Sequence, residues 1–151
     1  MKKIVLVFSC LLIACYAAAI FVPFEPDERR PGTRLAGELA EVQDTDWSFL
    51  TGRNRIFVET RTWYLVPHSV TTTSWVVDKT FYVPCGNCAS KRWPKNVQAD
   101  PRVRLKVNGE IYERVAVRIE DSEERRRLMG VPAGASFPEG VAIYRMDAEK
   151  S

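Results

Sequence analysis

The part of the chain from residue 76 to residue 119 constrains the fold most, because it alternates β-rich runs with turn residues. Within it, residues 103–107 alternate apolar and basic side chains, and a second alternating run follows at 111–119. Asn108 and Gly109 separate the two runs and are the favoured pair of a type I′ turn, whose twist matches that of two antiparallel strands. The segment therefore predicts an antiparallel hairpin within a larger sheet.

The alternation along residues 111–119 also predicts which side chains face the core. Side chains two residues apart on a strand point to the same face of the sheet. Val115, Val117 and Ile119 share one face, and Arg114 and Arg118 share the other. Because arginine is rarely buried without a partner, we expect the apolar face to point into the core and the arginines to point into water.

Further β-rich runs lie on both sides of this hairpin. A strand is expected at residues 55–60, with a continuation through 62–66 that ends at Pro67, because proline cannot donate to a central ladder. Asp78 and Lys79 separate two more runs and predict a second two-residue hairpin. The remaining runs cover residues 69–77, 80–83 and 141–146.

A helix is expected after the second strand of the main hairpin. Asp121 can cap its first turn, and Glu124 stands at the reciprocal position of a capping box. Gly130 and Pro132 are residue types that end a helix. Six or so short strands with one late helix predict a mainly β fold, a small antiparallel barrel with helices outside it.

Three regions are expected along the 151 residues: an N-terminal apolar helix at 1–24, a linker with a short helix at 25–50, and the barrel domain at 51–148. Residues 23–33 hold three prolines and five charges, which is typical of a linker. Apolar residues at helical spacing in 34–42 predict a short amphipathic helix. An irregular packed connection is expected at 44–52.

The N-terminal segment is expected to export the domain. Lys2 and Lys3 precede an apolar stretch without charge up to Glu25, which is long enough to cross a bilayer. An uncleaved signal-anchor is the preferred interpretation. A cleaved signal peptide, with small residues at 17–19, and a lipoprotein carrying lipid on Cys15 are the alternatives. All three place the domain in the cell envelope, on the outer side of the cytoplasmic membrane.

The charge of the chain argues against nucleic-acid binding. The formal net charge is +3, and Lys2 and Lys3 contribute two of these charges, which leaves 20 basic against 19 acidic residues. Binding to a phosphate backbone needs a concentrated basic face. The run of arginines at 125–127 follows acidic residues on the predicted helix and is typical of a solvated face.

The middle of the chain resembles the deazaflavin-dependent nitroreductase family, which has the flavin-binding split-barrel (pyridoxamine phosphate oxidase-like) fold. The resemblance covers residues 80–129, about a third of the chain, and lies in the order and spacing of a strand, a small-residue loop, a Trp-x-x-Asn pair, a Val-rich strand and a helix. The residues that carry it are Phe81, Tyr82, Val83, Trp93, Asn96, Asp100, Pro101, residues 103–107, Gly109, Glu123, Glu124 and Arg125.

The resemblance implies a six-stranded split β-barrel with one or two flanking helices, often as a homodimer. It also implies an oxidoreductase that reduces quinones or nitro compounds with a deazaflavin coenzyme or FMN. It places the small-molecule cofactor near the loop after the strand that contains Phe81. Trp93 would stack on the cofactor and Asn96 would donate a hydrogen bond from its amide. Backbone donors around Gly86 and Asn87 would complete the site.

A second interpretation is a non-catalytic envelope binding module that has kept the barrel without the cofactor. Deazaflavin-binding members of the family carry a phosphate loop rich in Gly, Ser, Lys and Arg before the second strand. Here residues 62–69 contain no glycine and no basic residue. Close backbone approach to a phosphate favours glycine. Whether the chain is an enzyme therefore stays open at the level of the sequence.

Cys85 and Cys88 have three interpretations. A local disulfide that stiffens the loop is preferred in an oxidising compartment. A redox-active dithiol would need a neighbouring group that stabilises the thiolate. As metal ligands the two thiols supply only half of a tetrahedral site, and no metal is expected.

Single polar and aromatic residues also have two interpretations each. His68, the only histidine, is a general base or phosphate-facing donor, or else an exposed turn residue before a row of hydroxyl side chains. Trp93 frames a ligand or plugs the end of the barrel, and Asn96 binds a ligand or caps a turn.

Overall fold

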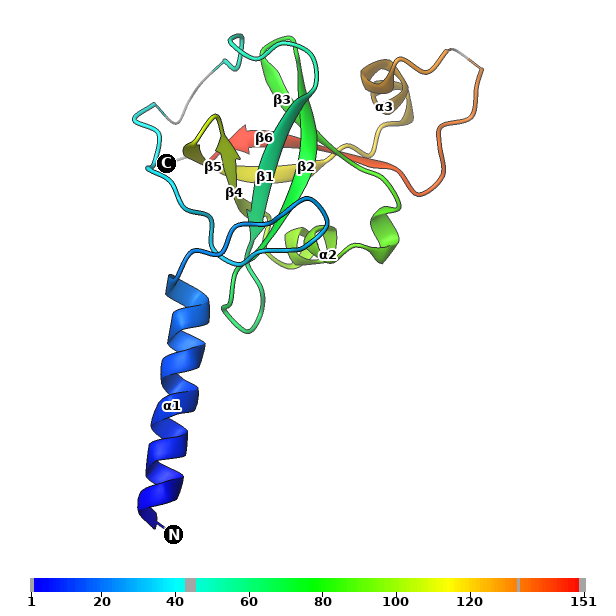
Figure 1. Ribbon diagram of the computed structural model, residues 1–151. Coiled ribbons are helices and arrows are strands. Elements are labelled where there is room, and N and C mark those ends of the chain that lie inside the picture. The colour runs from blue at the N-terminus through cyan, green and yellow to red at the C-terminus, as the bar shows by residue number, and fades with distance from the viewer. Residues whose placement is uncertain (1, 43–45, 133, 150–151) are drawn as a thin grey trace.

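The computed structural model describes residues 2–42, 46–132 and 134–149, and within these residues six antiparallel strands close into one barrel (Figure 1). This confirms the predicted fold class. Helix α1 (Lys2–Phe21) extends away from the barrel, α2 (Arg92–Ala99) lies at one end of it, and α3 (Ser122–Met129) lies at its side. The order around the barrel is β1 (Asn54–Thr60), β2 (His68–Val77), β3 (Thr80–Cys85), β6 (Ala142–Ala148), β5 (Glu110–Arg118) and β4 (Arg102–Val107).

Both predicted hairpin turns are present. Asp78 and Lys79 have φ angles of 48° and 64°, and Asn108 and Gly109 have φ angles of 50° and 96°. Positive φ at both central positions is the signature of a type I′ turn. The helix cap is also confirmed, because the Asp121 carboxylate accepts a hydrogen bond of 2.6 Å from the backbone N–H of Glu124.

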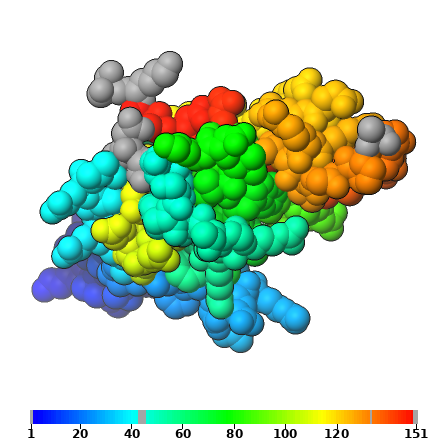
Figure 2. Space-filling model, turned by 90° about the horizontal axis from the view of Figure 1, so that it is seen from above, coloured from blue at the N-terminus to red at the C-terminus, as the bar shows by residue number. Residues whose placement is uncertain are grey.

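The interior of the barrel holds the main core. Phe81, Val83, Leu105 and Val58 are completely buried within it. A second, smaller cluster lies on the outer face under α3 and contains Tyr82, Ile119, Leu128 and Ile143. Figure 2 shows α3 and the loop after it projecting from one side of the barrel.

The predicted orientation of residues 111–119 is wrong for Arg114, Val115 and Val117, whereas Arg118 is exposed and Ile119 is buried, as expected. Arg114 is 2% exposed and shares a face with Tyr112 and Ala116, which belong to the main core, whereas Val115 and Val117 are only partly buried. The Arg114 guanidinium lies 5.0 Å from the ring centroid of Trp47, and its Nη1 donates to the carbonyl oxygen of Glu113. Cation–π and hydrogen-bond contacts of this kind make burial of the charge tolerable.

The predicted continuation of β1 through residues 62–66 is also wrong. These residues form part of the loop between β1 and β2, in which Thr62 Oγ1 donates to the carbonyl oxygen of Val66. Leu65 has a φ angle of 66°, which is incompatible with a strand.

Residues 34–42 are extended rather than helical, which corrects the prediction of a short helix. Strand β6 pairs with β5 only from Arg114 onward, so the first residues of β5 present an open edge. Residues 38–40 pair with this edge. The backbone N–H of Ile111 donates to the carbonyl oxygen of Glu38, and the N–H of Ala40 donates to the carbonyl oxygen of Ile111, both at 2.9 Å. The spacing of Leu35 and Leu39 suggested a helix, but the free hydrogen-bonding groups of β5 favour an added strand.

Glu59 fixes this extended segment to the barrel. Its carboxylate accepts a hydrogen bond of 2.7 Å from the backbone N–H of Leu35 and binds Arg104 at 3.0 and 3.1 Å. The Glu59 side chain is only 8% exposed. Removing a buried acceptor leaves its donors without a partner.

We expect Glu59→Ala to lower the free energy of unfolding by about 2 to 3 kcal/mol, measured by urea unfolding of the full chain in detergent. Glu28→Ala is the matched control, because Glu28 is exposed and lies 3.8 Å from Arg55 in a surface ion pair. Such pairs contribute less than about 1 kcal/mol. Equal effects of the two variants would contradict the structural role of Glu59.

Candidate functional site

A basic cleft of about 270 Å³ lies beside β2, and we name it the β2 cleft. Three separate parts of the chain form it: the loop after α1, strand β2, and the start of α2. The residues that line it are Glu28, Arg29, Arg30, Pro31, His68, Val70, Thr71, Thr72, Lys91, Arg92 and Trp93.

The donor groups of the β2 cleft suit an anion such as a phosphate. Arg29, Arg30, Lys91 and Arg92 all line it, and Glu28 is the acid among its described lining residues. The hydroxyl of Thr71 is buried and has no hydrogen-bond partner among the described residues. A buried hydroxyl of this kind can form a hydrogen bond with a ligand bound in the cleft.

Hydrogen bonds hold the arginine-bearing loop, which belongs to the segment predicted as a linker, against β2. Gly32 and Ser69 exchange backbone hydrogen bonds of 2.9 and 3.0 Å, and Phe24 N–H donates to Arg34 at 3.0 Å. A Cβ atom at Gly32 would clash with the carbonyl oxygen of Phe24 and the hydroxyl of Ser69. Glycine is therefore required at the point where the loop touches the strand.

Trp93 serves both the core and the cleft. It is 2% exposed, belongs to the main core and packs against Tyr144 with ring centroids 4.9 Å apart, and it also lines the β2 cleft. Pro94 follows it within the first turn of α2, where the missing N–H of proline costs no hydrogen bond.

The structure does not bring the other predicted cofactor residues into the β2 cleft. Asn96 donates from its amide to Thr60 Oγ1 at 2.9 Å, so this side chain ties α2 to β1. Gly86 and Asn87 lie in an exposed turn, with Asn87 at a φ angle of 52°. Of these described residues, none lines the β2 cleft.

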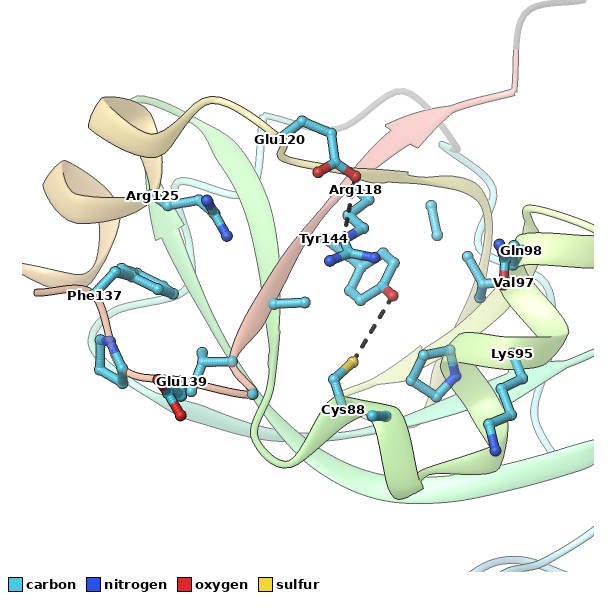
Figure 3. A pocket seen from close by; sticks show the side chains of 17 residues that line it. Cys88, Lys95, Val97, Gln98, Arg118, Glu120, Arg125, Phe137, Glu139 and Tyr144 are labelled. Carbon is cyan, nitrogen blue, oxygen red and sulfur yellow. Dashed lines mark hydrogen bonds and ion pairs between the residues drawn. The ribbon is translucent and has the colours of Figure 1, made fainter.

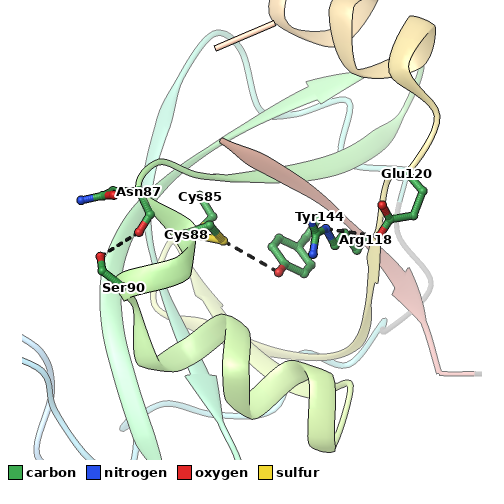
Figure 4. The surroundings of a disulfide bond; sticks show 7 residues. All are labelled: Cys85, Asn87, Cys88, Ser90, Arg118, Glu120 and Tyr144. Carbon is green, nitrogen blue, oxygen red and sulfur yellow. Dashed lines mark hydrogen bonds and ion pairs between the residues drawn. A yellow bond between two sulfur atoms is a disulfide. The ribbon is translucent and has the colours of Figure 1, made fainter. Parts of the chain in front are cut away.

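Cys85 and Cys88 form a disulfide with their Cα atoms 5.2 Å apart (Figure 4). Cys85 is completely buried, whereas Cys88 is half-buried and its backbone N–H donates to Gly140 at 2.8 Å. The disulfide thus stiffens the loop between β3 and α2, as the preferred interpretation of these cysteines expects. No group of three metal-ligating side chains occurs in the described part of the chain.

A second, larger cleft of about 790 Å³ lies between α2, α3 and the loop before β6, and we name it the α2–α3 cleft (Figure 3). Cys88 and Tyr144 lie in its middle, with Lys95 on one side and Arg125 and Phe137 on the other. The Tyr144 hydroxyl lies 3.9 Å from Cys88 Sγ. Burial raises the pKa of Tyr144, which keeps this hydroxyl protonated at neutral pH.

His68 lines the β2 cleft and is half-buried, so the interpretation as an exposed turn residue is wrong. Burial, and secondly the charge of Arg92, lower the pKa of His68. Both effects disfavour the imidazolium. His68 is therefore neutral at pH 7, and an anion in the cleft would favour its protonation.

This shift predicts a pH dependence of stability. As the pH falls below about 6.5, the unfolded chain protonates His68 before the folded chain does. The contribution of neutral His68 to the free energy of unfolding is therefore fully present above that pH. It is lost as the pH falls toward the lower pKa of the folded state. Unfolding midpoints of the full chain in urea should show this decrease, and His68→Gln should remove it. An unchanged slope in His68→Gln would contradict the assignment, because the chain has no other histidine.

Comparison with known proteins adds a family. Residues 49–148 match the model of a family described as F420H(2)-dependent quinone reductase. A search of curated proteins found no match.

Three solved structures resemble this chain. They are a protein from Listeria innocua provisionally described as a pyridoxamine 5′-phosphate oxidase (17% identity, 64% of this chain and 84% of that chain, TM-score 0.49), the conserved hypothetical protein Rv2991 from Mycobacterium tuberculosis (17%, 64% and 74%, 0.48), and a protein from Bacteroides thetaiotaomicron provisionally described as a 5-nitroimidazole antibiotic resistance protein (15%, 64% and 73%, 0.48).

Proposed function

Because the chain belongs to the F420H(2)-dependent quinone reductase family, we propose that it is an oxidoreductase that reduces quinones with the reduced deazaflavin coenzyme F420. The family assignment confirms the resemblance seen in the sequence and supports deazaflavin rather than FMN as the cofactor. The observation that carries the proposal is the β2 cleft, which combines four basic side chains with a buried, unpartnered threonine hydroxyl.

The β2 cleft supplies what the loop at residues 62–69 lacks. In this proposal Arg92, Lys91 and the Thr71 hydroxyl bind the phosphate of the coenzyme, and Arg29 and Arg30 attract its remaining negative charge. Charge-assisted hydrogen bonds to phosphate are among the strongest in proteins. The bound coenzyme supplies the hydride, while the indole of Trp93 contributes an apolar wall. This basic cleft favours the enzyme over the non-catalytic binding module.

The proposal includes a membrane tether through α1. Its 20 residues are long and apolar enough to cross a bilayer, and no residue of α1, which is described along its whole length, is buried against the barrel. A cleaved signal sequence passes the same test. With Lys2 and Lys3 in the cytoplasm, the barrel lies on the outer side of the cytoplasmic membrane. Lipidation of Cys15, cleavage after residues 17–19 and homodimerisation stay predictions.

A kinetic assay tests the proposed activity. The full chain in detergent is mixed with reduced F420 and a quinone such as menadione, and oxidation of the coenzyme is followed by its absorbance. We expect turnover that requires both the protein and the quinone. Absence of turnover by folded protein with quinones and with nitroaromatic acceptors would overturn the oxidoreductase assignment and favour the binding module.

A further inference from the structure

The loop between β1 and β2, residues 61–67, exposes two large apolar side chains. Trp63 is 92% exposed, a larger fraction than for any large apolar residue of α1, and Leu65 is 70% exposed. Exposed apolar side chains that gather at one place, rather than being scattered, indicate a contact surface. We name this segment the β1–β2 loop.

The β1–β2 loop lies beside the end of α1. In Figure 1 it extends from the barrel in the same direction as α1 and passes alongside the last turns of that helix. The hydroxyl of Tyr16 in α1 donates to the carbonyl oxygen of Tyr64 in the loop. Tyr16 precedes the last helical residue, Phe21, by five positions, which corresponds to roughly 7.5 Å along the helix axis. The loop therefore extends past the C-terminal end of α1 and lies beside its last turns.

The chemistry of the loop fits the boundary between water and lipid. Tryptophan and tyrosine are enriched at this boundary because their rings are amphipathic. Several backbone groups of the loop form hydrogen bonds within the loop itself. The N–H groups of Leu65 and Val66 donate to the carbonyl oxygens of Thr62 and Tyr64 at 3.1 and 2.9 Å. Thr62 Oγ1 donates to the carbonyl oxygen of Val66 at 2.6 Å. Internal hydrogen bonding lowers the cost of leaving water.

We propose that the β1–β2 loop inserts Trp63 and Leu65 into the interfacial layer of the membrane that α1 spans, as a second contact of the barrel with the lipid. The inference rests on the membrane tether proposed above. The continuity of the loop with α1, through Tyr16 and Tyr64, identifies lipid as its partner, because both elements reach the same depth.

This docking fixes the position of the β2 cleft relative to the membrane. Arg92, which lines the cleft, donates to the Tyr64 hydroxyl, and its guanidinium carbon lies 5.2 Å from the centroid of the Tyr64 ring. The cleft is therefore held beside the bilayer surface. A quinone dissolved in the lipid can reach a cleft in that position without leaving the membrane for bulk water.

Fluorescence quenching by brominated lipid tests the proposal. The full chain is reconstituted into phosphatidylcholine vesicles with or without bromine on the acyl chains, and the emission lost to bromine is compared for the unaltered chain and for Trp63→Phe. The difference between the two chains is the contribution of Trp63 to the quenching. The other tryptophans should contribute little, because Trp47 and Trp93 are buried and Trp75 is half-buried. We expect Trp63 to account for most of the emission lost to bromine.

A control places a tryptophan at the opposite end of the barrel. Phe49 is 53% exposed and packs on Trp47, so Phe49→Trp combined with Trp63→Phe reports an exposed residue far from α1. We expect no bromine-dependent loss from this position. Vesicle flotation distinguishes failure of the loop docking from failure of the membrane tether. Protein that floats with vesicles but shows equal quenching at positions 63 and 49 overturns the docking and leaves the tether intact. Protein that does not float overturns both.

Discussion

Arg92→Gln is expected to weaken binding of the deazaflavin coenzyme by about 10- to 100-fold, because a charged hydrogen bond to phosphate contributes about 1.5 to 3 kcal/mol. Arg92 lines the β2 cleft beside Lys91 and the unpartnered Thr71 hydroxyl. The measurement is a titration of the full chain with F420, followed by coenzyme fluorescence. Lys91→Gln should act in the same direction through the loss of the neighbouring charge.

The matched control for this prediction is Lys79→Gln. Lys79 lies in the turn at the opposite end of β2 and pairs with Asp46 at 3.4 Å. The variant makes the same change in net charge, so it corrects for long-range attraction of an anionic coenzyme. Equal loss of affinity in Arg92→Gln and Lys79→Gln would show that the β2 cleft does not hold the phosphate.

Trp93→Ala is expected to lower the free energy of unfolding by about 3 to 5 kcal/mol, the usual cost of removing a large aromatic side chain from a core. The reason is that Trp93 is 2% exposed and packs against Tyr144. Urea unfolding of the full chain measures the loss. Trp93→Phe should recover much of it, because a second aromatic ring fills part of the same space.

A loss below about 1 kcal/mol in Trp93→Ala would be typical of an exposed site and would contradict the packing of Trp93. If the large loss is found, this variant cannot separate a binding role from a packing role, since one side chain lines the cleft and completes the core. Arg92 is the better probe of the site, because its exposed side chain lies outside the core.

Local sequence patterns predicted most of the barrel. Both type I′ turns follow from the local sequence. Asn108 and Gly109 tolerate positive φ, and Asp78 and Lys79 are the only two residues between their strands, so they must form a two-residue turn. The helix at α3 follows from Asp121 and Gly130, which act within one turn of the residues they cap. Such signals are complete within a few residues, so a single sequence contains them.

The errors concern contacts between distant parts of the chain. Arg114 was expected in water because both its charge and the alternation along the strand placed it on the outer face. Instead, Trp47, 67 residues earlier in the sequence, contacts its guanidinium inside the barrel. Likewise, residues 34–42 have helical spacing, yet the open edge of β5 near Ile111 binds them in extended form. Neither partner can be identified from the local pattern.

The candidate site was predicted in part. The sequence singled out Trp93 and His68, and both line the β2 cleft. It missed Arg29 and Arg30, which were assigned to a linker, because the contact of their loop with β2 joins residues almost 40 positions apart. The sequence signal that could have indicated this contact is Gly32, a glycine near charged residues, where the backbone of the loop closely approaches Ser69.

The measurement that tests the central claim most directly is a titration of the full chain in detergent with F420 and, separately, with FMN. Coenzyme fluorescence and tryptophan quenching report binding. The proposed function predicts saturable binding of F420 that is tighter than binding of FMN and is weakened by Arg92→Gln. Folded protein that binds neither coenzyme, or binds both with an affinity that Arg92→Gln leaves unchanged, would contradict the assignment of the β2 cleft as a deazaflavin site.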